Sequence, residues 1–169
     1  LKVPVYTASI AGTSLLGVFL AGNDNVLLVP EIAFDNELGI LEKHKIKYHV
    51  LKTNLTALGN NLLCNNNGCI VNPEYTEHEI KEIEKALNVP AKASTINALG
   101  IVGSLSIIRE KRCMVSNDIT SSEKRALESA LKVKTYGGTA NFGSSFISSG
   151  LIANSHGFVI GDSSSGPEI

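Results

Sequence analysis

Thiols and imidazoles are the side chains of this sequence that could carry covalent chemistry. A cysteine nucleophile needs a histidine as its base and an electropositive, partly open setting. The chain has the cysteines Cys64, Cys69 and Cys113 and the histidines His44, His49, His78 and His156. The cysteines fall in or beside predicted hairpin strands, where a free thiol behaves as a small buried hydrophobe. Local sequence pairs none of them with an imidazole, although folding could still bring such a pair together. We expect no enzymatic activity and no catalytic residue.

Metal and cofactor sites have no support in the spacing of these residues. The cysteines are odd in number and lack C-x-x-C spacing, so they predict neither a disulfide framework nor a zinc site. Gly137-Gly138-Thr139 and Gly161-Asp162-Ser163 are isolated glycine-rich turns without the spacing of a phosphate-binding loop. We expect no metal and no cofactor. Free thiols suit a reducing compartment, which favours the cytoplasm.

The composition sets the class of protein that these residues belong to. The 169 residues are 43% hydrophobic and 18% charged, which suits one compact domain. No apolar run reaches the roughly 18 residues of a membrane-spanning helix. The net charge is −1, whereas proteins that hold nucleic acid through its phosphates carry an excess of Lys and Arg. A protein surface is therefore the expected main contact, and RNA a secondary one.

Internal repetition is the strongest signal of organisation. Four segments begin alike: Val3-Pro4-Val5-Tyr6, Ile46-Lys47-Tyr48-His49, Val89-Pro90-Ala91-Lys92 and Val133-Lys134-Thr135-Tyr136. Small-residue corners follow at Leu16-Gly17, Leu58-Gly59 and Val102-Gly103, and by register near Ile147-Ser148. The period of roughly 44 residues predicts repeats at about 3–44, 46–88, 89–132 and 133–169 within a single domain spanning 1–169.

Each repeat continues with a strand, a polar turn and a second strand. The turns are Asn23–Asn25, Asn65–Gly68, Arg109–Lys111 and Asn154–Gly157. Three of the four contain the Asn, Asp or Gly that tight hairpins favour. The apolar runs Val26–Val29 and Phe158–Ile160 are typical of buried strands.

A helix closes the repeat. Thr76 with Glu79 and Thr120 with Glu123 have capping-box spacing, and Asp35 is expected to cap the helix that ends near His44. Such a unit cannot bury its sheet alone, so copies must pack together. We favour a ring, with strands toward the axis and helices outside, over a linear solenoid that would need polar end caps.

Several stretches carry a family resemblance that runs through the whole chain in order. They are Ala11-Gly12-Thr13, Ala21-Gly22-Asn23, Leu55–Asn60, Gly138–Ser144, Ala153–Gly157 and Ser165–Glu168. Together they resemble the translation initiation factor six family, with an archaeal character. The resemblance implies a five-bladed β/α propeller of the pentein type, of which this chain shows four quasi-repeats. A first repeat and a C-terminal helix are expected to be missing from the sequence.

The resemblance also implies a function. Members of that family bind the large ribosomal subunit and keep the small subunit from joining it, in translation initiation and ribosome biogenesis. The implied contact is ribosomal protein uL14 near the sarcin–ricin loop, with limited rRNA contact, no membrane contact and a monomeric factor. The implied location is the cytoplasm, and also the nucleolus in a eukaryote. Two alternatives stay open: a guanidine-modifying hydrolase of the pentein fold, and a generic repeat scaffold for other partners.

Candidate ribosome-binding residues cluster at the repeated corners, which should lie toward one end of the ring. They are Leu16, Gly17, Asn23, Gly59, Asn60, Gly103, Asn141, Phe142 and Ser148. Glycine also permits close backbone approach, and Asn also stabilises turns, so a structural role competes with binding. Leu16 and Phe142 are candidate anchors that could equally be core residues. Asn141 is included through the resemblance alone.

Overall fold

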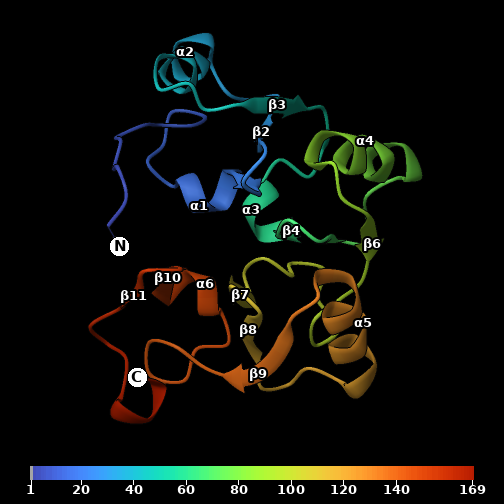
Figure 1. Cartoon of the computed structure of the whole chain (residues 1–169), viewed down its shortest axis with the longest axis vertical. Coiled ribbons are helices and arrows are strands. Elements are labelled where there is room, and N and C mark those ends of the chain that lie inside the picture. The colour runs from blue at the N-terminus through green and yellow to red at the C-terminus, as the bar shows by residue number, and fades with distance from the viewer. Residues whose placement is uncertain (1) are drawn as a thin grey trace.

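The computed structural model describes residues 2–169 as four related α/β units arranged around a central axis (Figure 1). The strands are β1 (Ala21–Gly22), β2 (Leu27–Pro30), β3 (Tyr48–Leu51), β4 (Leu62–Cys64), β5 (Cys69–Val71), β6 (Ala91–Ala93), β7 (Ser106–Arg109), β8 (Arg112–Ser116), β9 (Lys134–Gly138), β10 (Leu151–Asn154) and β11 (Gly157–Ile160). The helices are α1 (Leu16–Phe19), α2 (Asp35–Lys43), α3 (Leu58–Asn61), α4 (Glu77–Leu87), α5 (Ser121–Leu131), α6 (Ile147–Gly150) and the 3-10 helix η1 (Gly166–Glu168). The α/β class and the repeated strand-hairpin-helix unit agree with the sequence analysis.

Each sheet begins with an antiparallel hairpin and, in three units, gains a third strand. The sheets are β1-β2-β3, β4-β5-β6 and β7-β8-β9, with β10-β11 as a two-stranded fourth. The third strand follows the helix and pairs parallel to the second. It therefore comes from the start of the next sequence repeat, so each sheet crosses a repeat boundary. The first repeat's opening segment, Val3–Tyr6, forms no strand among the described residues.

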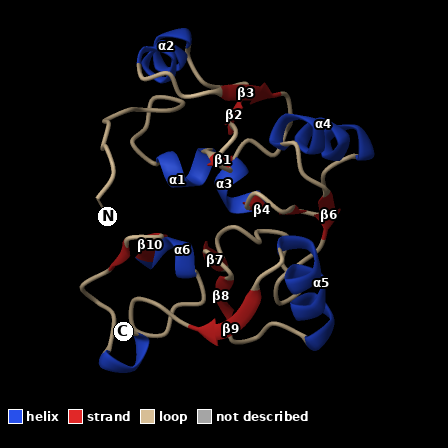
Figure 2. Cartoon of the chain, viewed as in Figure 1, coloured by secondary structure: helices blue, strands red, loops and turns tan. Residues whose placement is uncertain are grey.

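The longer helices lie on the outside of the ring and the hairpins lie nearer the axis (Figure 2). Buried Ile83 and Leu87 of α4 and Leu127 and Leu131 of α5 point into the core. The helix α4 packs against β2 and β3 of the preceding unit, and α5 packs against β5. Neighbouring units thus share their cores. No helix within residues 2–169 is long and apolar enough to cross a membrane.

The predicted helix caps are correct at two sites and wrong at a third. Thr76 and Thr120 are N-caps, and each accepts a hydrogen bond from the backbone N–H of the glutamate three residues on. Asp35 is not a cap, because it is already the first helical residue and Phe34 precedes it as N-cap. The Glu37 carboxylate accepts a hydrogen bond from the Phe34 N–H at 2.9 Å instead, so the first turn is satisfied without Asp35.

The buried strand predicted at 26–29 is confirmed, but the one predicted at 158–160 is wrong. In β2, Leu28 and Val29 are fully buried. In β11, Phe158 and Val159 are about half exposed. The reason is that β11 pairs only with β10 among the described residues, whereas β2 is covered by β3 and by α4.

The strand directions give the ring two distinct ends. The first strand of each hairpin starts at a corner and ends at the hairpin turn. The second strand returns, so the helix N-terminus lies at the same end as the corner. We call this the corner end, and call the end with the hairpin turns and helix C-termini the hairpin end.

The four corners meet at the axis. Gly103 N–H donates to the Asn60 carbonyl at 2.9 Å, and Ser148 N–H donates to the Ser104 carbonyl at 3.3 Å. The backbones approach so closely that an added Cβ at Gly59 would collide with the Gly17 carbonyl, and one at Gly103 with the Gly59 carbonyl. Glycine is therefore required at these two corners.

Replacing Gly103 with Ala should destabilise the fold by about 2–3 kcal/mol, because the new methyl group overpacks against immovable backbone. Gly17→Ala is the matched control, since no atom lies within 4 Å of the position that its new methyl group would take. It should stay within about 1 kcal/mol of the parent protein. Urea denaturation followed by circular dichroism measures both. Equal loss of stability in the two variants would contradict the close contact at the axis.

Candidate binding face at the corner end

Three tight turns shape the corner end. They close through paired backbone hydrogen bonds between Ile10 and Thr13, Ile96 and Leu99, and Ala140 and Ser144. Their central residues have positive φ: Ala11 and Gly12, Asn97 and Ala98, and Asn141, Phe142 and Gly143. Positive φ is unusual for a bulky side chain, so the +63° of Phe142 is a strained backbone conformation held by its surroundings.

A glutamate holds each of these turns in place. Glu37 accepts hydrogen bonds from Ala11 N–H at 2.8 Å and Gly12 N–H at 3.0 Å. Glu123 accepts from Ala98 N–H at 3.0 Å and from the Thr95 hydroxyl at 2.6 Å. Each glutamate also accepts from the N-cap N–H of its own helix. One carboxylate thus joins a helix N-terminus to a turn more than twenty residues away in sequence.

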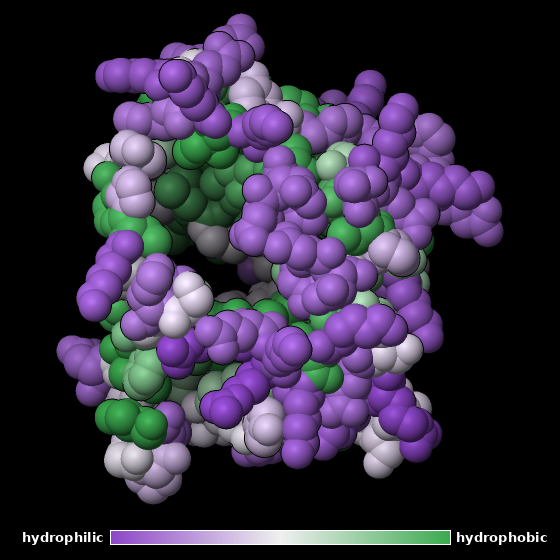
Figure 3. All heavy atoms as spheres, in the orientation of Figure 1, coloured by the Kyte–Doolittle hydropathy of each residue, from purple (hydrophilic) through white to green (hydrophobic). Residues whose placement is uncertain are grey.

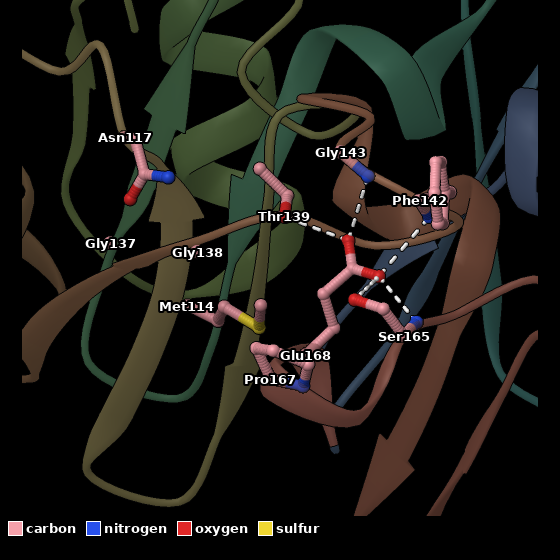
Figure 4. Close-up of a pocket in the computed structure, with 10 residues that line it drawn as sticks. All are labelled: Met114, Asn117, Gly137, Gly138, Thr139, Phe142, Gly143, Ser165, Pro167 and Glu168. Carbon is pink, nitrogen blue, oxygen red and sulfur yellow. Dashed lines mark hydrogen bonds between the residues drawn. The ribbon is translucent and has the colours of Figure 1, made fainter.

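The fourth unit repeats this arrangement with Glu168 (Figure 4). Its carboxylate accepts from Phe142 N–H at 3.1 Å, Gly143 N–H at 2.9 Å and the Thr139 hydroxyl at 2.7 Å. It also accepts from the N–H and hydroxyl of Ser165. Glu168 lines a cavity of about 450 Å³ beside Met114, but its oxygens are already occupied by these donors. It therefore holds the Phe142 turn and is not poised as a general base.

The hydrogen bonds keep these carboxylates ionised. Burial by itself would raise the pKa of Glu123, but the donors from Thr95, Thr120 and Ala98 together outweigh it and lower the pKa to about 2. The backbone N–H groups of Ser165 and Gly143 are the main causes that lower the pKa of Glu168 to about 2. The same balance lowers the pKa of Glu37, where burial opposes hydrogen bonds from Phe34 and Gly12.

Large apolar side chains project from the corner end. Phe142 is 83% exposed, and Phe146 and Leu15 are also exposed. Leu15 and Phe146 occupy the same register, one residue before the corner helices α1 and α6. These three residues, which we call the apolar tips, lie in or directly after the tight turns of the first and fourth units. A partner could cover these side chains, and exposed Phe34 and Leu99 lie at the same end.

Eight of the nine predicted site residues lie at the corner end, and Asn23 does not. The corner residues Leu16, Gly17, Gly59, Asn60, Gly103 and Ser148 surround the axis, and Asn141 and Phe142 lie on the tight turn of the fourth unit. The prediction that Asn23 lies with them is wrong. Asn23 is in the β1–β2 turn at the hairpin end, where its Oδ1 accepts from the N–H groups of Asn25 and Val26.

The nine residues differ in how available they are. Gly103 is buried at the axis, and Leu16 packs against the core cluster of Ile10, Val29 and Leu41. Asn141 fills the space beside Gly161, where a Cβ would collide with its Oδ1. These residues shape the face from within. Phe142 and Ser148 are exposed, and Asn60 is half-buried, so they are the better candidates for direct contact.

Sequence reasoning missed a cavity at the hairpin end. The four hairpin turns converge on a hollow of about 540 Å³, lined by residues such as Asn23, Cys64, Asn66, Glu110 and Asn154. Figure 3 shows the centre of the ring hollowed between the units. The sequence held one signal for this cavity, which is that the polar turns recur at the same position in each repeat. Asn65 accordingly repeats the contacts of Asn23. Their side-chain N–H groups donate to the last carbonyls of the next unit's helix, at Leu131 and Leu87.

The thiols do not have the setting that catalysis requires. Cys69 and Cys113 are fully buried, and Cys64 is half-buried. Burial raises the pKa of Cys113 to about 12, which disfavours the reactive thiolate. His49 instead contacts Glu82 at 2.8 Å, and His44 stacks on Tyr6. Within residues 2–169, no group of three or more His, Cys, Asp or Glu side chains could hold a metal ion.

Together, the repeated units and the pinned turns define an α/β propeller with a rigid, preorganised face at one end. The eIF-6 family model matches residues 1–169, and the chain belongs to this family. The family resemblance read from the sequence is thereby confirmed. Members carry the name of a translation initiation factor, so the chain is a factor of translation initiation.

Curated relatives support the assignment at 34–46% identity and are mostly archaeal. Translation initiation factor 6 of Staphylothermus marinus is 42% identical over 100% of this chain and 76% of its own length. The protein of the same name from Saccharolobus solfataricus is 46% identical over 96% of this chain and 74% of its own. Among solved structures, a mutant of DDAH from Pseudomonas aeruginosa complexed with citrulline is 13% identical, with a TM-score of 0.48 over 70% of this chain and 47% of that one.

Asn23→Ala should destabilise the fold by about 1–2 kcal/mol, because it removes the hydrogen bond to Leu87 and two acceptor contacts in the turn. Asn25→Ala in the same turn is the control and should change stability by less than about 0.5 kcal/mol. Thermal unfolding at neutral pH measures both variants. An unchanged melting temperature for Asn23→Ala would exclude this structural role.

The low pKa of Glu123 predicts a pH dependence of stability. Its ionised form is favoured by folding, so its contribution is fully present above the ordinary pKa of 4.5 and is lost as the pH falls toward 2. Glu123→Gln should lower stability by about 2 kcal/mol at neutral pH and flatten the decline between pH 5 and 2. Urea unfolding across that range measures this, with exposed Glu110→Gln as the control. The same slope in both variants would refute the assignment.

Proposed function

We propose that this protein binds the large ribosomal subunit with its corner end and sterically prevents the small subunit from joining. The observation that carries the proposal is the set of apolar tips on or next to turns that glutamate carboxylates hold in place. Family membership supports the ribosomal context. A factor of this kind needs a large, complementary and rigid surface, and no reacting group.

Rigidity makes the corner end suitable for tight docking. Binding a mobile loop costs free energy for ordering it, whereas a preorganised loop avoids most of that cost. The Phe142 turn is fixed by its own backbone pair, Ala140 with Ser144, and by Glu168. Phe142 is therefore presented in one backbone conformation before any partner arrives.

A few well-packed aromatic residues supply most of the affinity of a typical interface. Phe142 lies within the Ala140–Ser144 turn, Phe146 lies two residues after it, and both are exposed. Leu15 offers an apolar contact from the first unit. Exposed Ser148 adds a polar rim near the axis, while its own hydroxyl donates to the Ser104 carbonyl.

The charge of the chain favours a protein as the main contact. A net charge of −1 gives little counterion-release affinity for rRNA. We infer that the corner end docks on ribosomal protein uL14 near the sarcin–ricin loop, with limited rRNA contact, and that the factor acts as a monomer. While this protein covers that surface of the large subunit, the small subunit cannot join. The block ends when another factor displaces the protein.

Phe142→Ala should weaken binding to purified large subunits at least about tenfold, because it removes the most exposed aromatic tip. Co-sedimentation through sucrose gradients measures binding, and loss of the joined ribosome peak measures anti-association. Phe158→Ala is the matched control, because Phe158 is an exposed aromatic residue beside the hairpin turn at the opposite end. It should bind like the parent protein.

The two possible failures have different meanings. Equal weakening in both variants would contradict the corner end as the binding face. It would still support binding of the parent protein to the large subunit. A parent protein that neither co-sediments with large subunits nor reduces subunit joining would overturn the ribosomal proposal, and would favour a repeat scaffold for another partner.

A further inference from the structure

Two cysteines face each other across the hairpin of the second unit. Cys64 at the end of β4 and Cys69 at the start of β5 are direct partners in the antiparallel register. The next pair toward the turn is Asn65 with Gly68, and the Asn65 N–H donates a hydrogen bond to the Gly68 carbonyl. The Cys69 N–H points away from β4 and donates to the Pro90 carbonyl. Since pair types alternate along an antiparallel ladder, Cys64 and Cys69 form a non-hydrogen-bonded pair.

That pair type brings the two thiols within bonding reach. Directly opposed residues in it have Cα atoms about 4.5 Å apart, inside the range of about 4.4–6.8 Å seen for disulfides. Their side chains lie on the same face of the hairpin, because direct partners always do. The pKa of the Cys69 thiol lies well above its usual range, mainly because of its hydrogen bond with Cys64 and also because Cys69 is buried.

Access to this pair is through Cys64. It is half-buried and lines the cavity at the hairpin end, whereas Cys69 is fully buried behind it. The equivalent register pairs in the other units are Gly22 with Leu27, Ile108 with Cys113, and Ala153 with Phe158. The dithiol is thus specific to the second unit, and Cys113 serves as an internal buried thiol without a partner cysteine in its hairpin.

We propose that Cys64 and Cys69 are a reversible oxidation site that closes to an intrachain disulfide on exposure to a peroxide. The Cys64 thiolate attacks one peroxide oxygen, the O–O bond breaks, and Cys64 becomes a sulfenic acid as hydroxide leaves and is protonated to water. The Cys69 sulfur then attacks the Cys64 sulfur. The S–O bond breaks, the Cys69 proton leaves with the hydroxide as a second water, and the S–S bond is formed. Two thiols are oxidised and one peroxide is reduced.

The bond should be labile. The Cα separation of this pair type is at the short end of the disulfide range, and strained disulfides are the more easily reduced ones. The loop that the bond closes is only the hairpin turn, so it constrains the unfolded chain little. Closing it also removes the Cys64 thiol proton that is donated to the Gly22 carbonyl at 3.0 Å. Oxidation therefore reaches the contact between the first and second units.

The test treats the folded protein with hydrogen peroxide, denatures it, and alkylates the remaining thiols for mass spectrometry. The parent protein should lose two of its three alkylatable thiols, keep Cys113, and regain both with dithiothreitol. The peptide that contains Cys64 and Cys69 should be lighter by two hydrogen atoms. Cys113→Ser should behave in the same way at the hairpin.

Cys64→Ser separates the proposed pair from general oxidation. This variant replaces the half-buried partner, and its fold is checked by circular dichroism. It should retain alkylatable Cys69 and Cys113 after peroxide, because the accessible attacking thiol is gone. Three alkylatable thiols in the treated parent, a Cys64 sulfinic acid beside a free Cys69, or a disulfide between two chains would each overturn the proposal.

Discussion

Close backbone approach at the axis is the constraint on which the ring depends. Units of a propeller converge where the radius is smallest, and at two of the corners the neighbouring backbone leaves no room for a Cβ. Gly59 and Gly103 meet this requirement by lacking a Cβ. At the fourth corner, Ser148 uses its N–H and its hydroxyl to reach the Ser104 carbonyl, so contact is kept without glycine. Once the corners are joined, the strand directions and the two ends of the ring follow.

The glutamate at the third position of α2, α4, α5 and η1 extends this order outward from the axis. Its carboxylate satisfies the helix N-terminus and, in three units, a turn with positive φ. Strain at these turns is tolerated because charge-assisted hydrogen bonds to their N–H groups are among the stronger ones in proteins. The second unit shows the dependence by contrast. No residue between Thr53 and Ala57 has positive φ. The Glu79 carboxylate accepts from the N–H and the hydroxyl of its own cap, Thr76, and it reaches the preceding loop through a hydrogen bond with the Thr53 side chain.

Much of the architecture could be predicted from the sequence because local chemistry determined it. The capping boxes at Thr76 and Thr120 and the four hairpin turns depend on residues a few positions apart. The errors arose where distant partners decide the outcome. Asp35 is not a cap because Glu37 already serves Phe34, and Phe158 is exposed because no described strand or helix covers β11. The grouping of Asn23 with the corners overlooked the predicted order of corner, strand and turn, which already placed Asn23 one strand away from the corner.

The same hydrogen bonds that order the corner end bear on the choice between catalysis and binding. A general base needs a carboxylate with a free oxygen and a pKa near the working pH. In Glu123 and Glu168 the oxygens accept from backbone and hydroxyl donors, and the pKa is lowered to about 2 in each. These groups are committed to holding loops rather than to moving protons. The loops that they hold expose apolar side chains, above all Phe142. A partner that covers an apolar side chain on a fixed loop stabilises the complex. The physical chemistry of this end of the ring therefore favours recognition of a surface.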